Sequence, residues 1–454
     1  MNIDCVAVVL AAGEGKRMKS KSPKALHKAA GKALTGWVVD AAMEATGARP
    51  VLVIGNGADA MREHFGDSVR YAVQEQQLGS GHAVMAAREF LAGDGYAIVM
   101  AGDMPLIKAE TLRHIALRAQ EKRLGVCLLT AVIPDPTGYG RVLREGAGVR
   151  IVEHRDATEA QRAVKEVNLS VYCFHIPALL KALDGLKANN DQGEYYITDC
   201  VHDIVGQGYA AEAVVCGDPD EYIGVNDRVQ LAEAARLLRR RINHKLMMDG
   251  VTIIDPDNTY IEAGVTVGQD AVIHPGVTLE GNTVIGEDAV LYPGSRIYNS
   301  TVGKGTKVQN SVLLDSVVGD NSTIGPYAYL RPKTVVGNGC RVGDFVEVKN
   351  AVIHDGAKVS HLSYIGDGEI GEKTNIGCGV VFVNYDGQKK SKTTVGKNAF
   401  VGCNANLIAP VTIGDGAYVA AGSTVTSDVE PDSLCIGRSR QTVIPGWAKK
   451  RRGE

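Results

Sequence analysis

Residues 261–297 read IEAGVTVGQDAVIHPGVTLEGNTVIGEDAVLYPGSRI, and an apolar residue returns at every sixth position of this stretch. That series is Ile261, Val267, Ile273, Leu279, Ile285, Leu291 and Ile297. A second series of mostly smaller residues has the same period: Val265, Ala271, Val277, Thr283, Ala289 and Ser295. An α-helix repeats at about 3.6 residues and a strand at about 2, so a period of six requires a backbone that turns a corner every six residues. The stretch therefore predicts a β-helix of stacked coils.

The six-residue period extends far beyond this stretch. With slips of one residue it continues to Phe382, and it resumes from Val395 to Val425, which predicts a β-helical domain of roughly 175 residues. The interruption at residues 383–394 is expected to be a loop pushed out of the stack. Because protruding loops of solenoid proteins often carry function, a functional site is expected near it.

Composition limits the class of protein. The chain has 454 residues, which predicts two or three domains, and its net charge of -3 is spread over interspersed charges of both signs. This balance argues against a nucleic-acid or anionic-membrane surface. Nine scattered cysteines without a CxxC pair indicate reduced thiols in a cytoplasmic protein and do not indicate zinc. No stretch reaches about 18 apolar residues, so no membrane span is expected.

A glycine-rich segment follows the first predicted strand, which covers residues 2–10. The segment reads AAGEGKRM over residues 11–18, and its glycines let backbone N–H groups approach a phosphate. Arg17 and Lys24 supply the positive charge that a triphosphate needs. The spacing is neither that of a dinucleotide fingerprint nor that of a P-loop. The segment therefore predicts a nucleotide site of another kind.

The following segments predict a doubly wound α/β sheet. Strands are expected at 51–55 and 97–100, with a helix at 58–65 between them. Asp103 follows the second of these strands in the sequence GDMPL. A carboxylate at the carboxyl edge of a parallel strand faces the usual ligand crevice, and an oxygen ligand there suits Mg²⁺.

Side-chain amides cluster in residues 74–82, which read QEQQLGSGH. An amide donates and accepts hydrogen bonds together, so Gln74 and Gln77 could read the imide edge of uracil. Gly79 and Ser80 could let the backbone approach the base. We expect His82 to be structural.

These motifs resemble the signatures of the sugar-phosphate nucleotidyltransferase family. LAAGEGKRM with Pro23-Lys24 is similar to its general motif, and QEQQLGSGH to that of its uridylyltransferase branch. In that family a sugar 1-phosphate attacks the α-phosphorus of a nucleoside triphosphate and releases pyrophosphate. The resemblance implies catalytic roles for Arg17 and Lys24. It also implies UTP contacts from Leu10, Ala11, Ala12, Gly13, Lys24, Gln74, Gln77, Gly79 and Ser80.

The order of the later motifs is similar to that in one group of this family. These motifs are GYGR at 138–141, EHRDA at 153–157, Asn168, GEYYITD at 193–199 and GVND at 224–227. The group comprises bacterial bifunctional enzymes that acetylate glucosamine 1-phosphate and then uridylylate the product. The resemblance implies that Gly140, Glu153 and Asn168 bind the N-acetylglucosamine moiety and that Asn226 joins Asp103 on Mg²⁺. The sequence departs from the group at Leu169-Ser170 and at Ala101, and these departures bear on the fine sugar contacts, not on the reaction.

The pattern changes to helical spacing over residues 227–248. About 20 residues make a helix of about 30 Å, which reads as a rigid connector. The predicted domains are a nucleotidyltransferase domain at 1–226, a linker helix at 227–249 and a β-helical acetyltransferase domain at 250–454.

Several side chains of the β-helix are not needed for turning. They lie in the coils around the extruded loop: Arg331, Lys349, His361, Tyr364, Asn375, Asn384, Tyr385 and Lys390. Arg331 and Lys349 offer two cations for a sugar phosphate. His361 has an unperturbed pKa near neutrality, which fits a general base that takes a proton from an amine attacking a thioester.

Arg331-Pro332, NIGCG at 375–379 and NYDG at 384–387 are similar to the acetyltransferase half of the same bifunctional group. The resemblance implies a left-handed β-helix, a homotrimer with the acetyl site between subunits, and His361 as the base, oriented by Glu347. Glucosamine 1-phosphate would be held by Arg331, Lys349, Tyr364, Asn375 and Lys390. Acetyl-CoA would be held by Cys378, Asn384, Tyr385, Cys403, Ala421 and Arg438. Cys378 replaces the commoner Ala and Cys403 the commoner Ser.

The leading prediction is a two-reaction enzyme with acetyl-CoA and UTP as substrates and Mg²⁺ as cofactor. It would make UDP-N-acetylglucosamine, a precursor of bacterial cell wall and lipopolysaccharide. Two alternatives stay open. The chain could be a single-activity nucleotidyltransferase with a structural β-helix, or a non-enzymatic scaffold that binds sugar nucleotides.

Overall fold

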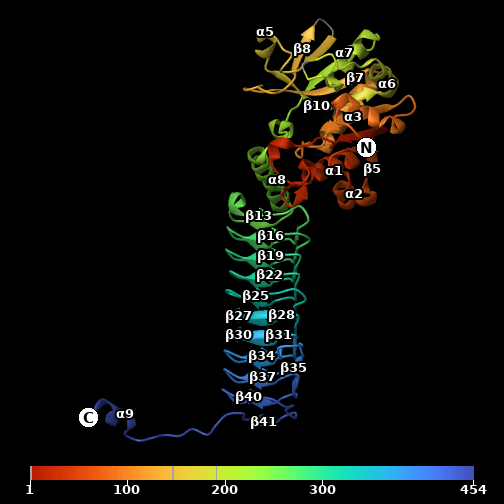
Figure 1. Ribbon diagram of the computed structural model, residues 1–454. Coiled ribbons are helices and arrows are strands. Elements are labelled where there is room, and N and C mark those ends of the chain that lie inside the picture. Colours follow the sequence, from red (N-terminus) through yellow and green to blue (C-terminus); the bar gives the residue numbers. More distant parts are fainter. Residues whose placement is uncertain (1–2, 146–147, 191) are drawn as a thin grey trace. The chain divides into compact units, whose positions relative to one another are not determined.

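The computed structural model describes residues 3–145, 148–190 and 192–454 (Figure 1). The chain divides into two compact units, Met1–Leu238 and Arg239–Glu454. Helix α8, Arg228–Met248, contains the boundary between them, and its bounds agree with the helix predicted at residues 227–248.

A mixed sheet forms the centre of the first unit. Among the described residues it has nine strands, with the path β11-β7-β10-β6-β1-β4-β5 and the pair β8–β9 attached to β10. Its strands are β1 Cys5–Leu10, β4 Val51–Ile54, β5 Arg70–Val73, β6 Tyr96–Ala101, β7 Val126–Val132, β8 Arg141–Glu145, β9 Gly148–Val152, β10 Glu166–His175 and β11 Ala211–Val215. The predicted strands β1, β4 and β6 are parallel, and β5 joins them in parallel, whereas β10 runs antiparallel between β6 and β7.

Helices cover both faces of this sheet. They are α1 Leu34–Thr46, α2 Ala58–Phe65, α3 Ser80–Ala86, α4 Ala109–Glu121, α6 Ile176–Gly185 and α7 Ile197–Gly206. The short helix α5, Glu159–Arg162, has no buried residue and takes no part in this cover. Apolar residues of α1, α2 and α4 pack in one core cluster, and those of α3, α6 and α7 in another. Within β1, Ala7 and Val9 belong to the first of these clusters, and Val8 between them belongs to the second. The sheet is therefore buried on both faces, which leaves its carboxyl edge for ligands. In the described chain, no helix combines the length and apolarity needed to cross a bilayer.

The second unit is the predicted β-helix, built from three parallel sheets (Figure 1). Among the described residues these have eleven, ten and nine strands, and we name them the first, second and third sheet. The first contains β12 Thr252–Ile253, β15 Val272–Ile273, β18 Val290–Leu291, β21 Lys307–Val308, β24 Thr323–Ile324, β27 Arg341–Asp344, β30 Lys358–His361, β33 Asn375–Ile376, β36 Phe400–Val401, β39 Tyr418–Val419 and β41 Leu434–Cys435. The second contains β13 Tyr260–Ile261, β16 Thr278–Glu280, β19 Arg296–Tyr298, β22 Val312–Leu314, β25 Tyr329–Leu330, β28 Glu347–Lys349, β31 Tyr364–Gly366, β34 Val381–Val383, β37 Asn406–Ile408 and β40 Thr424–Val425. The third contains β14 Thr266–Val267, β17 Val284–Ile285, β20 Thr301–Val302, β23 Val317–Val318, β26 Val335–Val336, β29 Val352–Ile353, β32 Gly368–Ile370, β35 Thr393–Val395 and β38 Val411–Ile413.

The residues of the six-residue series fill the interior of these coils. Of the series from Ile261 to Ile297, Val267 is partly buried and the other members are at most 2% exposed. These buried members and the apolar members of the smaller series belong to one core cluster that extends to Val429, and Val267 packs against it. Thr283 and Ser295 of the smaller series are buried as well. The prediction of a β-helix is therefore confirmed, and apolar burial along one continuous core holds the coils together.

The predicted extruded loop is also present. Strand β34 ends at Val383 and β35 begins at Thr393, and Tyr385 and Lys390 form an isolated antiparallel bridge within the loop. The N–H of Ser391 donates to the carbonyl of Asn384 at 2.9 Å. The loop is thus an ordered hairpin-like excursion beside the second and third sheets.

Two candidate active sites

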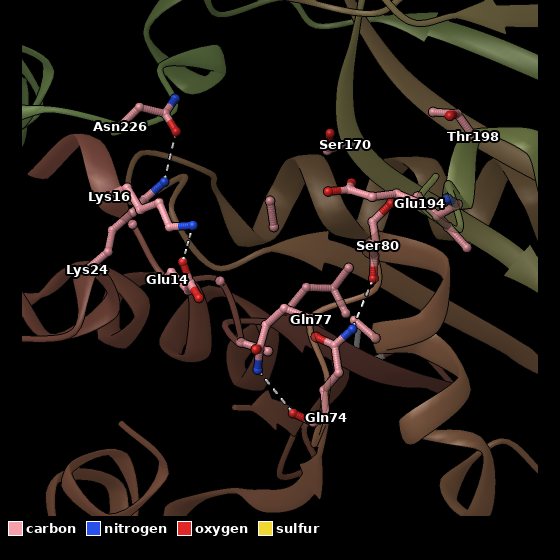
Figure 2. Close-up of a pocket in the computed structure, with 18 of the residues that line it drawn as sticks. Glu14, Lys16, Lys24, Gln74, Gln77, Ser80, Ser170, Glu194, Thr198 and Asn226 are labelled. Atoms are coloured by element: carbon pink, nitrogen blue, oxygen red, sulfur yellow. Dashed lines mark hydrogen bonds and ion pairs between the residues drawn. The ribbon is translucent and has the colours of Figure 1, made fainter. Parts of the chain in front are cut away.

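A cavity of about 600 Å³ lies in the first unit where β1 and β6 end (Figure 2). Of the residues predicted to bind nucleotide or sugar, it is lined by Leu10, Ala12, Gly13, Arg17, Lys24, Gln74, Gln77, Gly79, Ser80, Glu153 and Asn226. A smaller cavity of about 120 Å³ shares Leu10, Gly13 and Lys24 with it and is also lined by Ala11 and Asp103. Most of the first predicted site is therefore gathered in one place.

Gly15 of the glycine-rich loop lets the side chain of Lys24, from the following segment, pack against the loop and line this cavity. Gly15 has a φ of 63° and precedes a short 3₁₀ helix, Lys16–Met18. A Cβ at position 15 would lie 2.5 Å from the Cβ of Lys24, so glycine is needed both for the backbone angle and for this close approach. Lys16 pairs with Glu14 at 2.7 Å on the exposed rim, and Arg17 is exposed beside it. The loop thus presents basic side chains around the cavity mouth.

Lys24, Asp103 and Asn226 form the most polar part of the site. The Nζ of Lys24 lies 2.5 Å from Oδ2 of Asp103 and 2.9 Å from Oδ1 of Asn226. The N–H of Val225 donates to the carbonyl of Asp103 at 2.9 Å, which fixes the Asn226 loop beside β6. Two oxygen atoms therefore flank a position that a cation occupies, here the ammonium of Lys24. Such hard oxygen donors also fit Mg²⁺, which usually takes one or two protein ligands and completes its shell with water and phosphate. The described residues contain no group of three or more His, Cys, Asp or Glu side chains that could hold a metal ion.

Gln74 and His82 are joined by a hydrogen bond. Gln74 is 3% exposed, and its Nε2 lies 3.0 Å from Nδ1 of His82 and donates to the carbonyl of Gly79 at 3.1 Å. The Nε2 of Gln77 donates to the carbonyl of Gln74 at 3.3 Å (Figure 2). Because its amide N–H groups are engaged, Gln74 keeps its oxygen as a fixed acceptor. This contact gives His82 a positioning role, in keeping with the expectation that it is structural.

The region predicted to bind sugar contains a partly buried carboxyl group, that of Glu153. Its Oε1 accepts a hydrogen bond from Oγ1 of Thr198 at 3.2 Å. Burial raises the pKa of Glu153, the hydrogen bond from Thr198 opposes this rise, and the charges of Asp156 and Asp199 add to it. A carboxyl group held in this way can exchange hydrogen bonds with sugar hydroxyls.

Gly140 and Asn168 do not line the cavity. The buried Asn168 donates from Nδ2 to the hydroxyl of Tyr172 at 2.7 Å, and its N–H donates to the carbonyl of Gly140 at 2.9 Å. The residues that line this wall instead are Ser170, Tyr172, Glu194, Ile197 and Thr198. Glu194, Ile197 and Thr198 of this wall belong to the motif GEYYITD. Contacts with residues distant in the sequence hold the motif beside the cavity. The N–H of Ile197 donates to Oγ of Ser80 at 3.0 Å, and that of Gly81 to the carbonyl of Tyr195 at 2.7 Å.

A cationic cluster lies on the second sheet of the β-helix. The register of β25 with β28 stacks Arg331 on Lys349, and NH1 of Arg331 lies 2.7 Å from Oε1 of Glu347. Asp367 lies 3.7 Å from Nζ of Lys349 and accepts a hydrogen bond from Nδ2 of Asn384 at 2.5 Å. Lys390 joins the cluster from the extruded loop. The neighbouring amino group of Lys349 lowers the pKa of Lys390. Clustered cations of this kind suit a phosphate.

His361 is held by Asp344, one coil away. The two residues are paired in register between β27 and β30, and Nδ1 of His361 lies 2.7 Å from Oδ1 of Asp344. This hydrogen bond lowers the pKa of Asp344. Within one chain Glu347, which was expected to orient His361, lies on the second sheet and pairs with Arg331 instead. With Nδ1–H donating to the carboxylate, Nε2 of the exposed imidazole is left as a proton acceptor.

Most residues predicted to contact acetyl-CoA lie along the same edge of the β-helix as Asp344 and His361. Registers between neighbouring coils align Asp344, His361, Cys378, Cys403 and Ala421, which we name the His361 edge. Arg438 lies at its far end, where its Cδ is 3.7 Å from the Cβ position of Gly422. Since coils are spaced by about 4.8 Å, the three steps from His361 to Ala421 span about 14 Å. An extended thioester ligand could lie along such an edge.

The remaining predicted residues divide over two faces of the chain. Asn375 lies on the first sheet, in β33, whereas Arg331, Lys349 and Tyr364 lie in or beside strands of the second sheet. Asn384 and Tyr385 follow β34 of the second sheet, at the base of the extruded loop. A single chain therefore does not gather the whole predicted acetyl-transfer site.

Models of known protein families match both units. A MobA-like NTP transferase domain matches residues 7–166. The GMPPB C-terminal domain matches residues 256–331, and the bacterial transferase hexapeptide repeat matches residues 315–350 and 392–427. These matches agree with the nucleotidyltransferase fold of the first unit and the hexapeptide β-helix of the second.

Full-length relatives share about half of their residues with the chain. A protein from Acetivibrio thermocellus is 49% identical over 453 residues, covering 99% of this chain and 98% of the relative. One from Caldanaerobacter subterraneus subsp. tengcongensis is 51% identical over 450 residues, with 99% and 98% covered. One from Clostridioides difficile is 47% identical over 447 residues, with 98% and 97% covered. Each is described as the bifunctional protein GlmU, which confirms the predicted resemblance and favours the two-reaction prediction over both alternatives. The chain therefore belongs to the family of bifunctional GlmU enzymes, the uridylyltransferases and acetyltransferases of UDP-N-acetylglucosamine synthesis.

Proposed function

We propose that the chain acetylates glucosamine 1-phosphate in its β-helical unit and uridylylates N-acetylglucosamine 1-phosphate in its first unit. The observation that carries this proposal is the presence of two chemically different clusters in separate units. One is the Lys24–Asp103–Asn226 group, and the other is the Asp344–His361 pair. The first fits charge neutralisation, and the second fits proton transfer.

In the uridylyl-transfer step, a phosphate oxygen of the sugar phosphate attacks the α-phosphorus of UTP, and pyrophosphate leaves. This reaction needs positioning and charge stabilisation and no covalent enzyme intermediate. Lys24 and Arg17 line the cavity and would neutralise the triphosphate. Asp103 and Asn226 would hold Mg²⁺, which supplies Lewis-acid charge for the phosphates when bound. Gln74 and Gln77 would contact the base, and Glu153 the sugar.

In the acetyl-transfer step, the amine of glucosamine 1-phosphate attacks the carbonyl carbon of acetyl-CoA. The new N–C bond forms, the C–S bond breaks, and CoA leaves as its thiol after protonation. Nε2 of His361 would take the proton that the attacking nitrogen loses, while Asp344 holds the ring through Nδ1. Arg331, Lys349 and Lys390 would bind the sugar phosphate, with Tyr364 and Asn375 beside it.

The division of predicted residues over two faces supports a site shared between copies of the chain. The first sheet carries Asn375 and the His361 edge, and the second sheet carries Arg331, Lys349 and Tyr364. Two copies that bring these faces together would complete the acetyl site. We therefore include a homotrimer in the proposal, with small molecules as the substrates and the cytoplasm as the compartment.

A coupled assay tests this function. The purified chain is given glucosamine 1-phosphate, acetyl-CoA, UTP and Mg²⁺, and the products are separated by chromatography. UDP-N-acetylglucosamine is expected only when acetyl-CoA is present, whereas N-acetylglucosamine 1-phosphate with UTP should give it without acetyl-CoA. Formation of a UDP-sugar from the second mixture alone would contradict the proposed acetyl transfer.

A further inference from the structure

Two cysteines occupy equivalent corner positions in consecutive coils of the His361 edge. Ile376 pairs with Val401 in the register of β33 with β36, which places Cys378 beside Cys403 two residues later. The N–H of Asn404 donates to the carbonyl of Cys378 at 2.7 Å, so the two corners are in direct backbone contact. Coils about 4.8 Å apart bring the two Cα atoms within the range of about 4.4–6.8 Å found in disulfides.

Both thiols are free and open to reagents. Cys403 is exposed and Cys378 is partly buried, whereas Cys5, Cys127, Cys173, Cys200 and Cys340 are buried. Thiol exchange requires access to the sulfur, so Cys403 is the better first nucleophile of the pair. Cys378 lies between it and His361 on the same edge.

We propose that Cys378 and Cys403 form a reversible thiol pair that a CoA disulfide oxidises and that thereby switches off acetyl transfer. The inference rests on the proposed function, because that reaction would bind and release CoA along the His361 edge. The two residues already lie one coil step apart on the same edge.

The chemistry is two successive thiol–disulfide exchanges. The Cys403 thiolate attacks one sulfur of the CoA disulfide, a Cys403–CoA bond forms, and one CoA thiolate leaves. The Cys378 thiolate then attacks Sγ of Cys403, the Cys378–Cys403 bond forms, and the second CoA thiolate leaves. Two cysteine thiols lose two electrons in total, one CoA disulfide gains them, and the two cysteine protons end on the two CoA thiols. Excess thiol runs the exchange backwards.

The bridge would block the acetyl site and spare the nucleotidyl site. It would tie together two coils of the edge along which the thioester ligand would lie. Side chains in register on parallel coils point the same way, so their Cβ atoms stay about 4.8 Å apart, wider than a relaxed disulfide prefers. A strained, exposed disulfide is readily reduced, which suits a reversible switch.

To test this, the full chain is treated with CoA disulfide. The rates of acetyl transfer and uridylyl transfer and the mass of the protein are then measured on the same samples. Non-reducing tryptic maps should link the peptide of residues 374–389, which contains Cys378, to that of residues 398–438 through Cys403. Acetyl transfer should fall in proportion to the bridged fraction, uridylyl transfer should stay constant, and dithiothreitol should restore the loss.

Three variants give the test its controls, and each is compared with its own untreated rate. Cys403→Ser should be insensitive to the reagent, and Cys378→Ala should keep a stable CoA adduct on Cys403. Cys435→Ser, whose partner in register is Val419, should remain as sensitive as the wild type. Equal loss in Cys403→Ser and wild type would overturn the proposal, as would a wild-type CoA adduct that never resolves into the bridge. A wild type that transfers acetyl groups normally before and after treatment would overturn this inference and leave the proposed function standing.

Discussion

Nζ of Lys24 lies 2.5 Å from Oδ2 of Asp103, and Asn226 completes the group from a loop about 200 residues away along the chain. Only 15% of the Lys24 side chain and 29% of the Asp103 side chain are exposed, so the pair is little screened by water. The ammonium occupies the position between the two oxygens that a divalent cation would take. Metal binding there would release Lys24 toward the phosphates of a nucleotide.

Removing the carboxylate should therefore separate the two activities. For Asp103→Ala we expect uridylyl transfer, measured as pyrophosphate release, to fall by about 100-fold or more because charge stabilisation is lost. Acetyl transfer should stay near the wild-type rate because its residues lie in the other unit. Asp59→Ala, an exposed site on α2, is the matched control and should affect neither rate. A folded Asp103→Ala protein that loses both activities equally would contradict the assignment.

Gln74 should determine affinity for the uracil base. In Gln74→Leu the amide oxygen disappears, and His82 and the carbonyl of Gly79 lose their partner. We expect the KM for UTP to rise by about tenfold, which corresponds to one or two hydrogen bonds of ordinary strength. The KM for N-acetylglucosamine 1-phosphate should change little. Initial-rate kinetics with each substrate varied in turn would measure both, and an unchanged KM for UTP would show that Gln74 is purely structural.

Glu153 should make stability depend on pH in a predictable direction. Burial raises its pKa above the ordinary value of 4.5, so the folded state favours the protonated form. That contribution to stability is fully present below the unfolded-state pKa and is lost as the pH rises through the folded-state pKa. Glu153→Gln stays neutral, so its Tm relative to wild type should increase as the pH rises from 4.5 through that window. Thermal unfolding across this range measures it, and a difference in Tm that does not vary with pH would contradict the shift.

Phe382 and Gly368 should be coupled in the core of the β-helix. Phe382 is fully buried, and a Cβ at position 368 would lie 2.6 Å from Cδ2 of its ring. Gly368→Ala should therefore lower the free energy of unfolding by about 1–3 kcal/mol through overpacking. Adding Phe382→Leu should recover part of that loss, because the smaller side chain makes room. Denaturant unfolding of the two single variants and the double variant gives the coupling, and strict additivity would show that the two residues do not compete for space.

The β-helix was predictable from sequence because two residues in every six face a narrow interior, and both series repeat with a visible period. The extruded loop was predictable for the same reason, as an interruption of the period. The antiparallel β10 was not, because VNLSVYCF is buried almost throughout and therefore lacks the alternation that marks a half-exposed strand.

The sites show the same contrast. Lys24, Asp103 and Asn226 were predicted from motifs, and the structure brings them into contact. Asp344 was missed as the partner of His361, because 17 residues separate them and only the coil length of this β-helix shows that they stack. Ser170 was missed as a lining residue because the fold of β10, not a local pattern, turns it toward the cavity. Thr198 lies in the motif GEYYITD, but the motif alone does not show that this side chain lines the cavity.

The measurement that tests the central claim most directly is thiol release from acetyl-CoA in the presence of glucosamine 1-phosphate, with wild type and His361→Ala compared. Two independent active sites predict rapid release by the wild type and a fall of about 100-fold or more in the variant, as expected for the loss of a general base. Uridylyl transfer by the same variant should equal that of the wild type. A wild-type chain that makes UDP-N-acetylglucosamine from its acetylated precursor but releases no thiol would contradict the account, and the β-helix would then be a structural module.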